Sequence, residues 1–342
     1  MRRMALVAAA TAALAAFVVM GSWFLAARQL QADIAGWTER QRAEGVLFSP
    51  GEIAIGGFPF RLDVTVPNPS LASADGRRRW EGPAIHATAP LWRRGRLDYE
   101  ASGRHRYRFT RADGASREIL LDLFQARGRV ALDQGGIRMA GLSADKARIT
   151  GTAPGQIVAE ALAAELLLSP EHAADLKEDS ASFALSTRSI AFLGEGAPRA
   201  SALPVQSLEV RIALTGPLPW GTTPGALTRW RDAGGTLELR RLELGWSGLT
   251  VEGDGTLALD EYMRPEGAVA LRLAGLHPTL QKLTAEGVLA PEEADLIARR
   301  AGELSSPDLG DPGRLLIAVS AQDGRLTVRE RTYRILQPVS AP

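Results

Sequence analysis

The chain carries few side chains of the types that enzymes use for catalysis, and their spacing forms no recognised motif. The four histidines are His86, His105, His172 and His277, and none has a second histidine or a carboxylate at the spacing of a metal site. There is no cysteine, which excludes thiolate metal ligands, a cysteine nucleophile and disulfides. We therefore expect no metal and no other cofactor.

Motifs for serine nucleophiles and for phosphate binding are missing as well. No Gly-x-Ser-x-Gly sequence occurs, and the glycine-containing run at 194–200 lacks the Lys-Ser pair of a phosphate-binding loop. Three nearby acids, Asp254, Asp260 and Glu261, would be the candidates for a carboxylate pair. Asp254, however, lies between two glycines, which is the composition of a tight turn. The sequence predicts that the protein is not an enzyme; an enzyme acting on envelope polymers is the weaker alternative.

The stretch from Gly234 to Gly275 gives the clearest signal for architecture. Apolar and polar residues alternate along it, and turn residues interrupt the alternation at regular intervals. The phase slips by one residue at Arg240-Arg241, and such a slip moves side chains to the other face of a sheet unless a bulge absorbs it. We expect three or four short antiparallel strands here, bent at a bulge.

The same alternation recurs along most of the chain between residues 46 and 335, and 35 glycines and 20 prolines suit a protein of strands and turns. Residues 156–168 fit either a helix or a strand, and neighbouring strands favour a strand. Short helices are expected at 170–179, 224–233, 278–286 and 292–303, the last with Leu296 and Ile297 facing the core. The predicted class is mainly β with a few helices, arranged as an elongated, curved antiparallel sheet.

The amino terminus has the composition of a membrane segment. Met1-Arg2-Arg3 precedes an uncharged run from Met4 to Ala27, and these 24 residues would form a helix of about 36 Å. That length crosses the hydrocarbon core of a bilayer. A cleavable signal peptide is the alternative, but its apolar region would span only about 7–15 residues. The sequence therefore favours an uncleaved transmembrane anchor.

The flanking charges predict the orientation of the anchor. Arg2 and Arg3 precede the run, whereas few basic residues follow it closely, which places the amino terminus in the cytoplasm. We expect a single-pass inner-membrane protein with the bulk of its chain in the periplasm. It would comprise an anchor at 1–27, an amphipathic stalk helix at 28–45 and a β-rich extracytoplasmic domain at 46–335. That domain is either one body or two β halves that share a sheet.

Arginine is concentrated in one part of a chain whose net charge is only +1. Ten arginines and three acids lie between Arg77 and Arg111. Opposite an anionic bilayer, each arginine would contribute about 1 kcal/mol of attraction; a solvated sheet face is the alternative. The candidates for contact with a membrane surface are Arg93, Arg94, Arg96, Arg104, Arg106 and Arg108. The small net charge and the expected location argue against nucleic acid as a partner.

Several strings of turn and strand residues resemble a known family. They are GWTERQRAEG at 36–45, GFPFRLDV at 57–64, LELGWSGLTVEGDGTLALD at 242–260 and RPEGAVALRLAG at 264–275. The chain resembles the uncharacterised Gram-negative envelope family catalogued as domain of unknown function 2125. The resemblance implies an envelope protein and carries no activity or catalytic residue. More loosely, the predicted architecture is similar to membrane-anchored proteins whose curved β-sheets form an apolar trough for lipids.

Two hypotheses about function follow. In the first, the protein binds lipid or another amphiphile in a groove of the curved sheet. The candidate groove residues are Phe58, Phe60, Leu237, Leu239, Leu242, Leu244 and Trp246. In the second, it is a structural or scaffolding envelope protein with a closed core and a protein partner that the sequence does not identify. An open apolar surface would favour the first hypothesis.

Overall fold

The computed structural model describes residues 2–43, 45–92, 95–111, 114–133, 136–151, 155–194, 203–218, 225–308, 311–329 and 331–336. Side chains are described from residue 17 onward, except at 307–308, 311–313 and 334–335. The chain forms two compact units, unit 1 at Met1–Ile137 and unit 2 at Arg138–Pro342.

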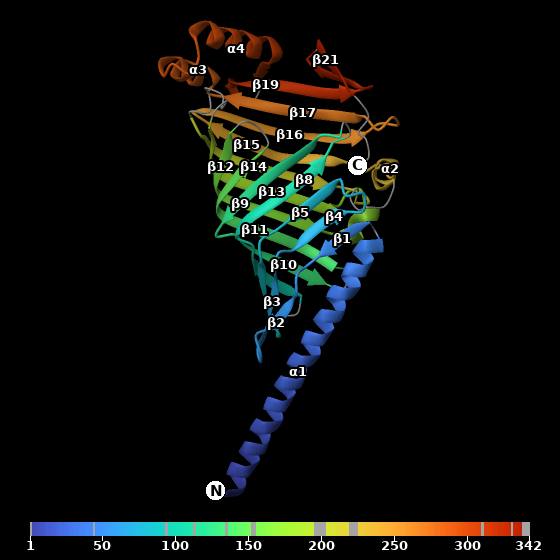
Figure 1. Ribbon diagram of the computed structural model, residues 1–342. Helices are drawn as coiled ribbons and strands as arrows, with labels where there is room; N and C mark the ends of the chain where they lie inside the picture. Colours follow the sequence, from blue (N-terminus) through green and yellow to red (C-terminus); the bar gives the residue numbers. More distant parts are fainter. Residues whose placement is uncertain are drawn as a thin grey trace. The chain divides into compact units, whose positions relative to one another are not determined.

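Unit 1 begins with one continuous helix, α1 (Arg2–Ala43), shown in blue in Figure 1. Gly45 ends it with a φ of +81° and donates its N–H to Arg42 O, which is the conformation typical of a glycine that ends a helix. The predicted anchor lies largely on residues 4–16, whose side chains are outside the described ones. Among the residues that are described, no helix is both long enough and apolar enough to cross a bilayer.

The strands of unit 1 form two antiparallel ladders. One contains, in order of pairing, β1 (Val46–Ser49), β4 (Ser70–Ser73), β5 (Arg78–Glu81), β8 (Gly103–Thr110) and β9 (Ser116–Phe124). The other contains β2 (Ala54–Gly56), β3 (Arg61–Val66), β6 (Ile85–Pro90), β7 (Arg96–Glu100) and β10 (Arg127–Asp133).

Helix α1 is docked on β3 through a small apolar core. Trp23, Ala27 and Leu62 are buried together, and Leu30 packs against them. The indole N–H of Trp23 donates to Arg61 O at 2.8 Å, so the ring is buried without leaving its polar atom unpaired. The direction of α1 relative to the β2–β3 hairpin is fixed by this contact.

Unit 2 is an antiparallel meander in which successive strands pair (Figure 1). Its strands are β11 (Gly136–Thr150), β12 (Gln156–Leu168), β13 (Ala181–Leu193), β14 (Val205–Leu214), β15 (Leu237–Trp246), β16 (Leu249–Leu259), β17 (Pro265–Ala274), β18 (Ser306–Asp308), β19 (Asp311–Gln322), β20 (Arg325–Val328) and β21 (Arg331–Ile335). Strand β17 pairs with β19, which also pairs with the short β18. The prediction of a strand at 156–168 is confirmed, and so is the mainly β, antiparallel class.

The helices of unit 2 are η1 (Pro170–Ala174), α2 (Ala226–Asp232), α3 (Leu276–Ala285) and α4 (Pro291–Leu304). The first is a 3-10 helix, shorter than predicted, because Asp175 adopts an extended conformation. The prediction that Leu296 and Ile297 face the core is wrong, since both side chains are exposed. The less exposed residues of α4 are instead three alanines and Leu304, with Ala294 and Ala298 one turn apart.

Helix α3 supplies the most enclosed leucine of unit 2, and it offers a test of packing. Leu283 is 1% exposed, whereas Leu296 of α4 is 49% exposed. Leu283→Ala should lower the free energy of unfolding by roughly 2–5 kcal/mol, because it leaves a cavity. Leu296→Ala, the matched control, should change it by less than about 0.5 kcal/mol. Urea titration followed by circular dichroism measures both, and equal losses would contradict this packing.

Candidate functional site

The sheet of unit 2 has one apolar face, which follows from the pairing of its strands. In an antiparallel sheet, residues that are directly opposite one another project to the same side. One such row runs from Val210 to Leu242, then to Gly253, Leu271 and Ile317. Adjacent rows repeat the pattern, so leucine, isoleucine and valine side chains from β14 to β19 gather on one surface.

We call this surface the apolar face. It comprises the even-numbered residues 208–214 of β14, the odd-numbered residues 249–257 of β16, 267–273 of β17 and 315–321 of β19, and Leu237, Leu239, Leu242, Leu244 and Trp246 of β15. All five candidate groove residues of β15 therefore lie side by side, as the alternation in the sequence predicted.

A β-bulge keeps the five residues of β15 on the same face. Ile212 pairs with Leu239 and Arg211 with Arg241, so Arg240 is the extra residue. The pairing with β16 shifts at the same place, between Leu239 and Leu242. The bulge predicted at Arg240-Arg241 is thus confirmed. Without it, the leucines that follow would point to the opposite side.

The apolar face is only half-buried. None of the ten residues of β15 is fully buried, and the buried residues of β14, β16 and β17 are the small Ala213 and Gly253. A Cβ at Gly253 would lie 2.9 Å from a methyl carbon of Leu271 and 3.2 Å from Leu242 Cβ. The glycine therefore gives the two leucines room to lie over the strand between them. The face is a surface of leucines rather than a closed core.

The opposite face is charged and paired. Arg241 donates a hydrogen bond to Glu243 and lies 3.5 Å from Glu209, and the hydrogen bond to Glu243 is the main reason why the pKa of Arg241 is raised. Further cross-strand pairs on this face are Arg272 with Asp254 and Arg314 with Glu252. Such side chains are stable in water, so the sheet is amphipathic, with one face suited to solvent and the other to an apolar partner.

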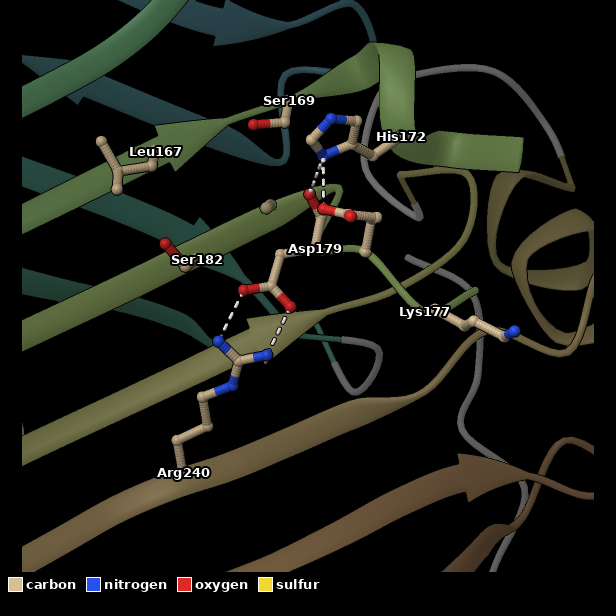
Figure 2. Close-up of a pocket in the computed structure, with 9 residues that line it drawn as sticks. Leu167, Ser169, His172, Lys177, Asp179, Ser182 and Arg240 are labelled. Atoms are coloured by element: carbon tan, nitrogen blue, oxygen red, sulfur yellow. Dashed lines mark hydrogen bonds and ion pairs between the residues drawn. The ribbon is translucent and has the colours of Figure 1, made fainter. Parts of the chain in front are cut away.

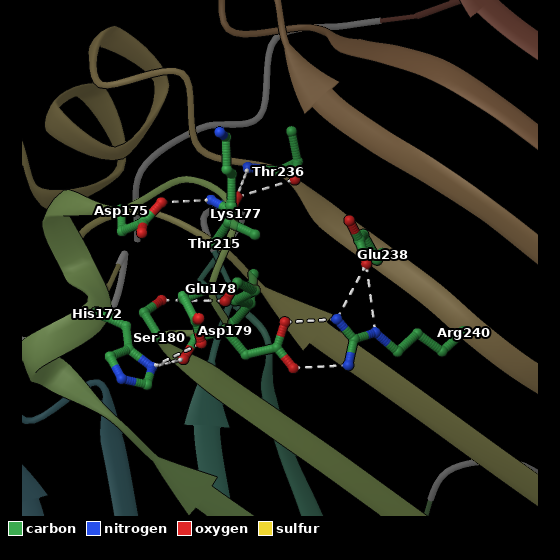
Figure 3. Close-up of polar contacts among 11 residues, drawn as sticks. His172, Asp175, Lys177, Glu178, Asp179, Ser180, Thr215, Thr236, Glu238 and Arg240 are labelled. Carbon is green, nitrogen blue, oxygen red and sulfur yellow. Dashed lines mark hydrogen bonds and ion pairs between the residues drawn. The ribbon is translucent and has the colours of Figure 1, made fainter.

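A polar cavity of about 340 Å³ lies on the charged face (Figure 2). It is lined by Leu167, Ser169, His172, Lys177, Glu178, Asp179, Ala181, Ser182 and Arg240. Arg240 Nη1 and Nη2 donate to the two oxygens of Asp179 at 2.6 and 2.5 Å, as Figures 2 and 3 show, and Arg240 also bonds Glu238 at 3.3 Å. His172 Nδ1 is 3.2 Å from Asp179 O.

We interpret the contacts of Arg240 in this cavity as a support for the bulge. Burial lowers the pKa of Arg240, but the bonds and charges of Asp179 and Glu238 outweigh burial, so that the pKa is raised overall. Arg240 is the extra residue of β15, and its guanidinium is bonded to Asp179 in the loop before β13. Its planar fork fits a carboxylate in two-point contact, which fixes direction as well as distance. Within the described ranges, no group of three potential metal ligands converges.

Phe58 and Phe60, which were grouped with the leucines of β15, lie in unit 1. They occupy the turn between β2 and β3, where both are exposed and the ring of Phe58 meets that of Trp23 at 5.6 Å. They belong to the docking site of α1 in unit 1, whereas β15 belongs to unit 2. Sequence spacing gave no indication of this, because the contact joins residues 35 positions apart.

The candidate membrane-surface arginines that the structure describes are balanced by acids. Arg104 makes a two-point contact with Asp122 at 2.7 and 3.1 Å, and Arg106 and Arg108 lie beside Glu81 and Glu118. Arg96 lies 3.6 Å from Asp98. Arg93 and Arg94 are outside the described residues. Sequence reasoning missed Glu118 and Asp122 because they reach these arginines from β9, through the register of β8 with β9.

A family model described as "Uncharacterized protein conserved in bacteria (DUF2125)" matches residues 23–329. The chain belongs to this family. The match begins at Trp23, which docks α1 on β3, and it includes the whole apolar face of the DUF2125 chain. A search of curated proteins and a search of solved structures each returned no match.

In this DUF2125 protein two of the three candidate acids for a carboxylate pair, Asp254 and Asp260, have structural partners. Asp254 pairs with Arg272, and Asp260 closes the turn between β16 and β17. Asp260 Oδ1 accepts the backbone N–H groups of Tyr262 at 2.9 Å and Arg264 at 2.8 Å, while Oδ2 accepts Arg264 Nε at 2.7 Å. Asp260 is therefore a turn residue, whereas the prediction that Asp254 lies in a tight turn is wrong, because Asp254 lies within β16 and pairs with Ala270.

The turn predicts a dependence of stability on pH. Burial raises the pKa of Asp260, but the bonds from Arg264 and Tyr262 outweigh it and the pKa is lowered. A depressed carboxyl pKa stabilises the fold above the unfolded value of about 3.9, and this contribution is lost as the pH falls through the folded pKa. Asp260→Asn should flatten the decline in urea midpoint below about pH 4. The control is Asp323→Asn; identical profiles for both variants and the parent would contradict the argument.

The bulge predicts which single-residue deletion β15 tolerates. Deleting Arg240 removes the extra residue and leaves Leu239 and Leu242 on their face, at a cost of no more than about 1 kcal/mol for an exposed ion pair. Deleting Glu238 puts the half-buried Leu237 and Leu239 on opposite faces, and should cost more than the deletion of Arg240, roughly 1.5–3 kcal/mol for the apolar surface that one leucine exposes. Urea unfolding compares the two. A larger loss on deletion of Arg240 would show that the bulge does not set the register.

Proposed function

We propose that this DUF2125 protein is a non-enzymatic, membrane-anchored envelope protein that binds lipid or another amphiphile on the apolar face of unit 2. One observation carries the proposal: the side chains of a five-strand apolar surface stay half-buried, while the opposite surface is charged. Folded soluble proteins rarely leave contiguous apolar patches beyond a few hundred Å² unless the patch has a partner.

The chemistry of the face suits an acyl chain. Leucine, isoleucine and valine offer no hydrogen bond, so they recognise apolar length rather than a headgroup. Trp246, the aromatic residue of β15, donates its indole N–H to Leu203 O at 3.1 Å, which leaves its ring to act as an apolar surface. Each methylene of a bound chain that leaves water contributes about 0.8 kcal/mol. A chain of lipid length thus supplies enough energy for binding without a polar contact.

The amino-terminal run gives the protein access to such a ligand. Met4–Ala27 has the length of a membrane span and follows two arginines, and α1 continues without a break to Ala43. We place the anchor in the inner membrane, the amino terminus in the cytoplasm and the sheet in the periplasm. A curved sheet would wrap a bound chain, and the bulge at Arg240 is where it bends.

A substitution on each face tests lipid binding. Leu244→Glu puts a charge among the leucines of the apolar face and should reduce copurifying phospholipid several-fold, because burying an unpaired carboxylate is costly. Leu167→Glu is the matched control, since Leu167 is exposed and pairs with Ser182 on the charged face. Phospholipid per protein is measured by native mass spectrometry after gentle extraction.

The outcomes of this experiment separate the two hypotheses about function. Phospholipid on the parent and on Leu167→Glu, with little on Leu244→Glu, supports the apolar face as the binding surface. A parent protein that is consistently empty would overturn lipid binding and favour the scaffolding role with a protein partner. Equal phospholipid on the parent and on both variants would show that the lipid is held elsewhere.

A further inference from the structure

A second apolar surface lies in unit 1, away from any role proposed so far. Phe24, Phe58, Phe60 and Trp92 are 58%, 50%, 60% and 70% exposed. We call these four residues the aromatic end. Aromatic rings of this size usually dominate cores and interfaces, because each can bury 150–250 Å². Four such rings exposed on one surface therefore indicate that the surface binds a partner.

The four rings come from three segments that the fold brings together. Phe24 on α1 and Phe58 in the β2–β3 turn have ring centroids 6.3 Å apart, and both rings flank the buried Trp23. Leu91 donates its N–H to Phe60 O at 3.2 Å, which holds Trp92, the next residue, beside this turn. The aromatic end is thus a built surface of unit 1 rather than a set of scattered side chains.

The aromatic end is fixed at a defined level of α1. The buried contact of Trp23 with Arg61 O holds the helix on β3 at residue 23, and the uncharged run ends at Ala27. Phe17, Val18 and Leu25 of α1 are each more than half exposed. The exposed apolar surface is therefore continuous from the described part of the anchor into the aromatic end.

We propose that the aromatic end inserts into the headgroup region of the bilayer that holds the anchor. Aromatic side chains prefer this interface, where their rings meet both acyl chains and polar groups. The continuity with α1 identifies the lipid bilayer as the occupant, because any surface that receives residues 17–25 also receives the rings beside them. Unit 1 then stands on the membrane through the β2–β3 turn and Trp92, in addition to the anchor. The inference rests on the membrane anchor of the proposed function.

The absence of cysteine allows a direct test on the full chain. Single variants Phe60→Cys and Trp92→Cys, each labelled with a nitroxide, are reconstituted into vesicles of phosphatidylethanolamine and phosphatidylglycerol. Collisions with oxygen, which partitions into lipid, are compared with collisions with a water-soluble nickel chelate. Val18→Cys reports the anchor. Leu47→Cys is the matched control, since Leu47 is 41% exposed and follows the far end of α1, about 30 Å along the helix from Trp23.

Labels at residues 60 and 92 should give a ratio of oxygen to nickel collisions several-fold above that at residue 47 and below that at residue 18, as expected for the headgroup region. If they resemble residue 47 while residue 18 lies in lipid, the aromatic end faces water and the inference is overturned, although the anchor stands. A label at residue 18 that faces water overturns both the anchor and the inference. Neither result bears on the phospholipid count of the Leu244→Glu variant, so lipid binding by unit 2 is judged separately.

Discussion

The hydrogen-bonded register between successive strands is the constraint on which unit 2 depends. Because side chains alternate with a period of two, one uncompensated residue would invert every side chain beyond it. The chain meets this constraint locally: Arg240 bulges out of β15, and Leu242, Leu244 and Trp246 return to the face of Leu239. Backbone pairing, rather than contact among the leucines, therefore decides which surface is apolar.

This arrangement gives unit 2 an unusual distribution of stabilising contacts. Its most enclosed large side chains, Trp230, Leu280 and Leu283, belong to the helices, whereas the leucines of the strands remain half-buried. Ion pairs on the charged face are exposed and each contributes only about 0–1 kcal/mol. A sheet built in this way leaves apolar surface unburied, and a ligand that covered the surface would stabilise the fold in proportion to its affinity and concentration.

The sequence predicted the features that depend on neighbouring residues and missed those that depend on distant ones. The alternation of apolar and polar residues predicted the strands, including the one at 156–168, and the bulge at Arg240. Each of these follows from the phase of the alternation within a short segment. The alternation could not show that Leu296 is exposed, because tertiary contacts decide that α4 packs through the face that carries its alanines. Nor could it assign Phe58 to the side of Trp23, or bring Asp122 to Arg104, because those contacts require the docking of α1 and the register of β8 with β9.

Helix α1 is held to unit 1 at two places: Trp23 is docked on β3, and Trp37 meets Phe48 of β1 with ring centroids 5.0 Å apart. The helix between them is unbroken, so these attachments share one helical phase. One residue added between Trp23 and Trp37 would turn one attachment by about 100° relative to the other and lengthen the span by about 1.5 Å. The helix between Trp23 and Trp37 therefore fixes both the distance between the two attachments and their rotation relative to one another. Its length is set in whole turns.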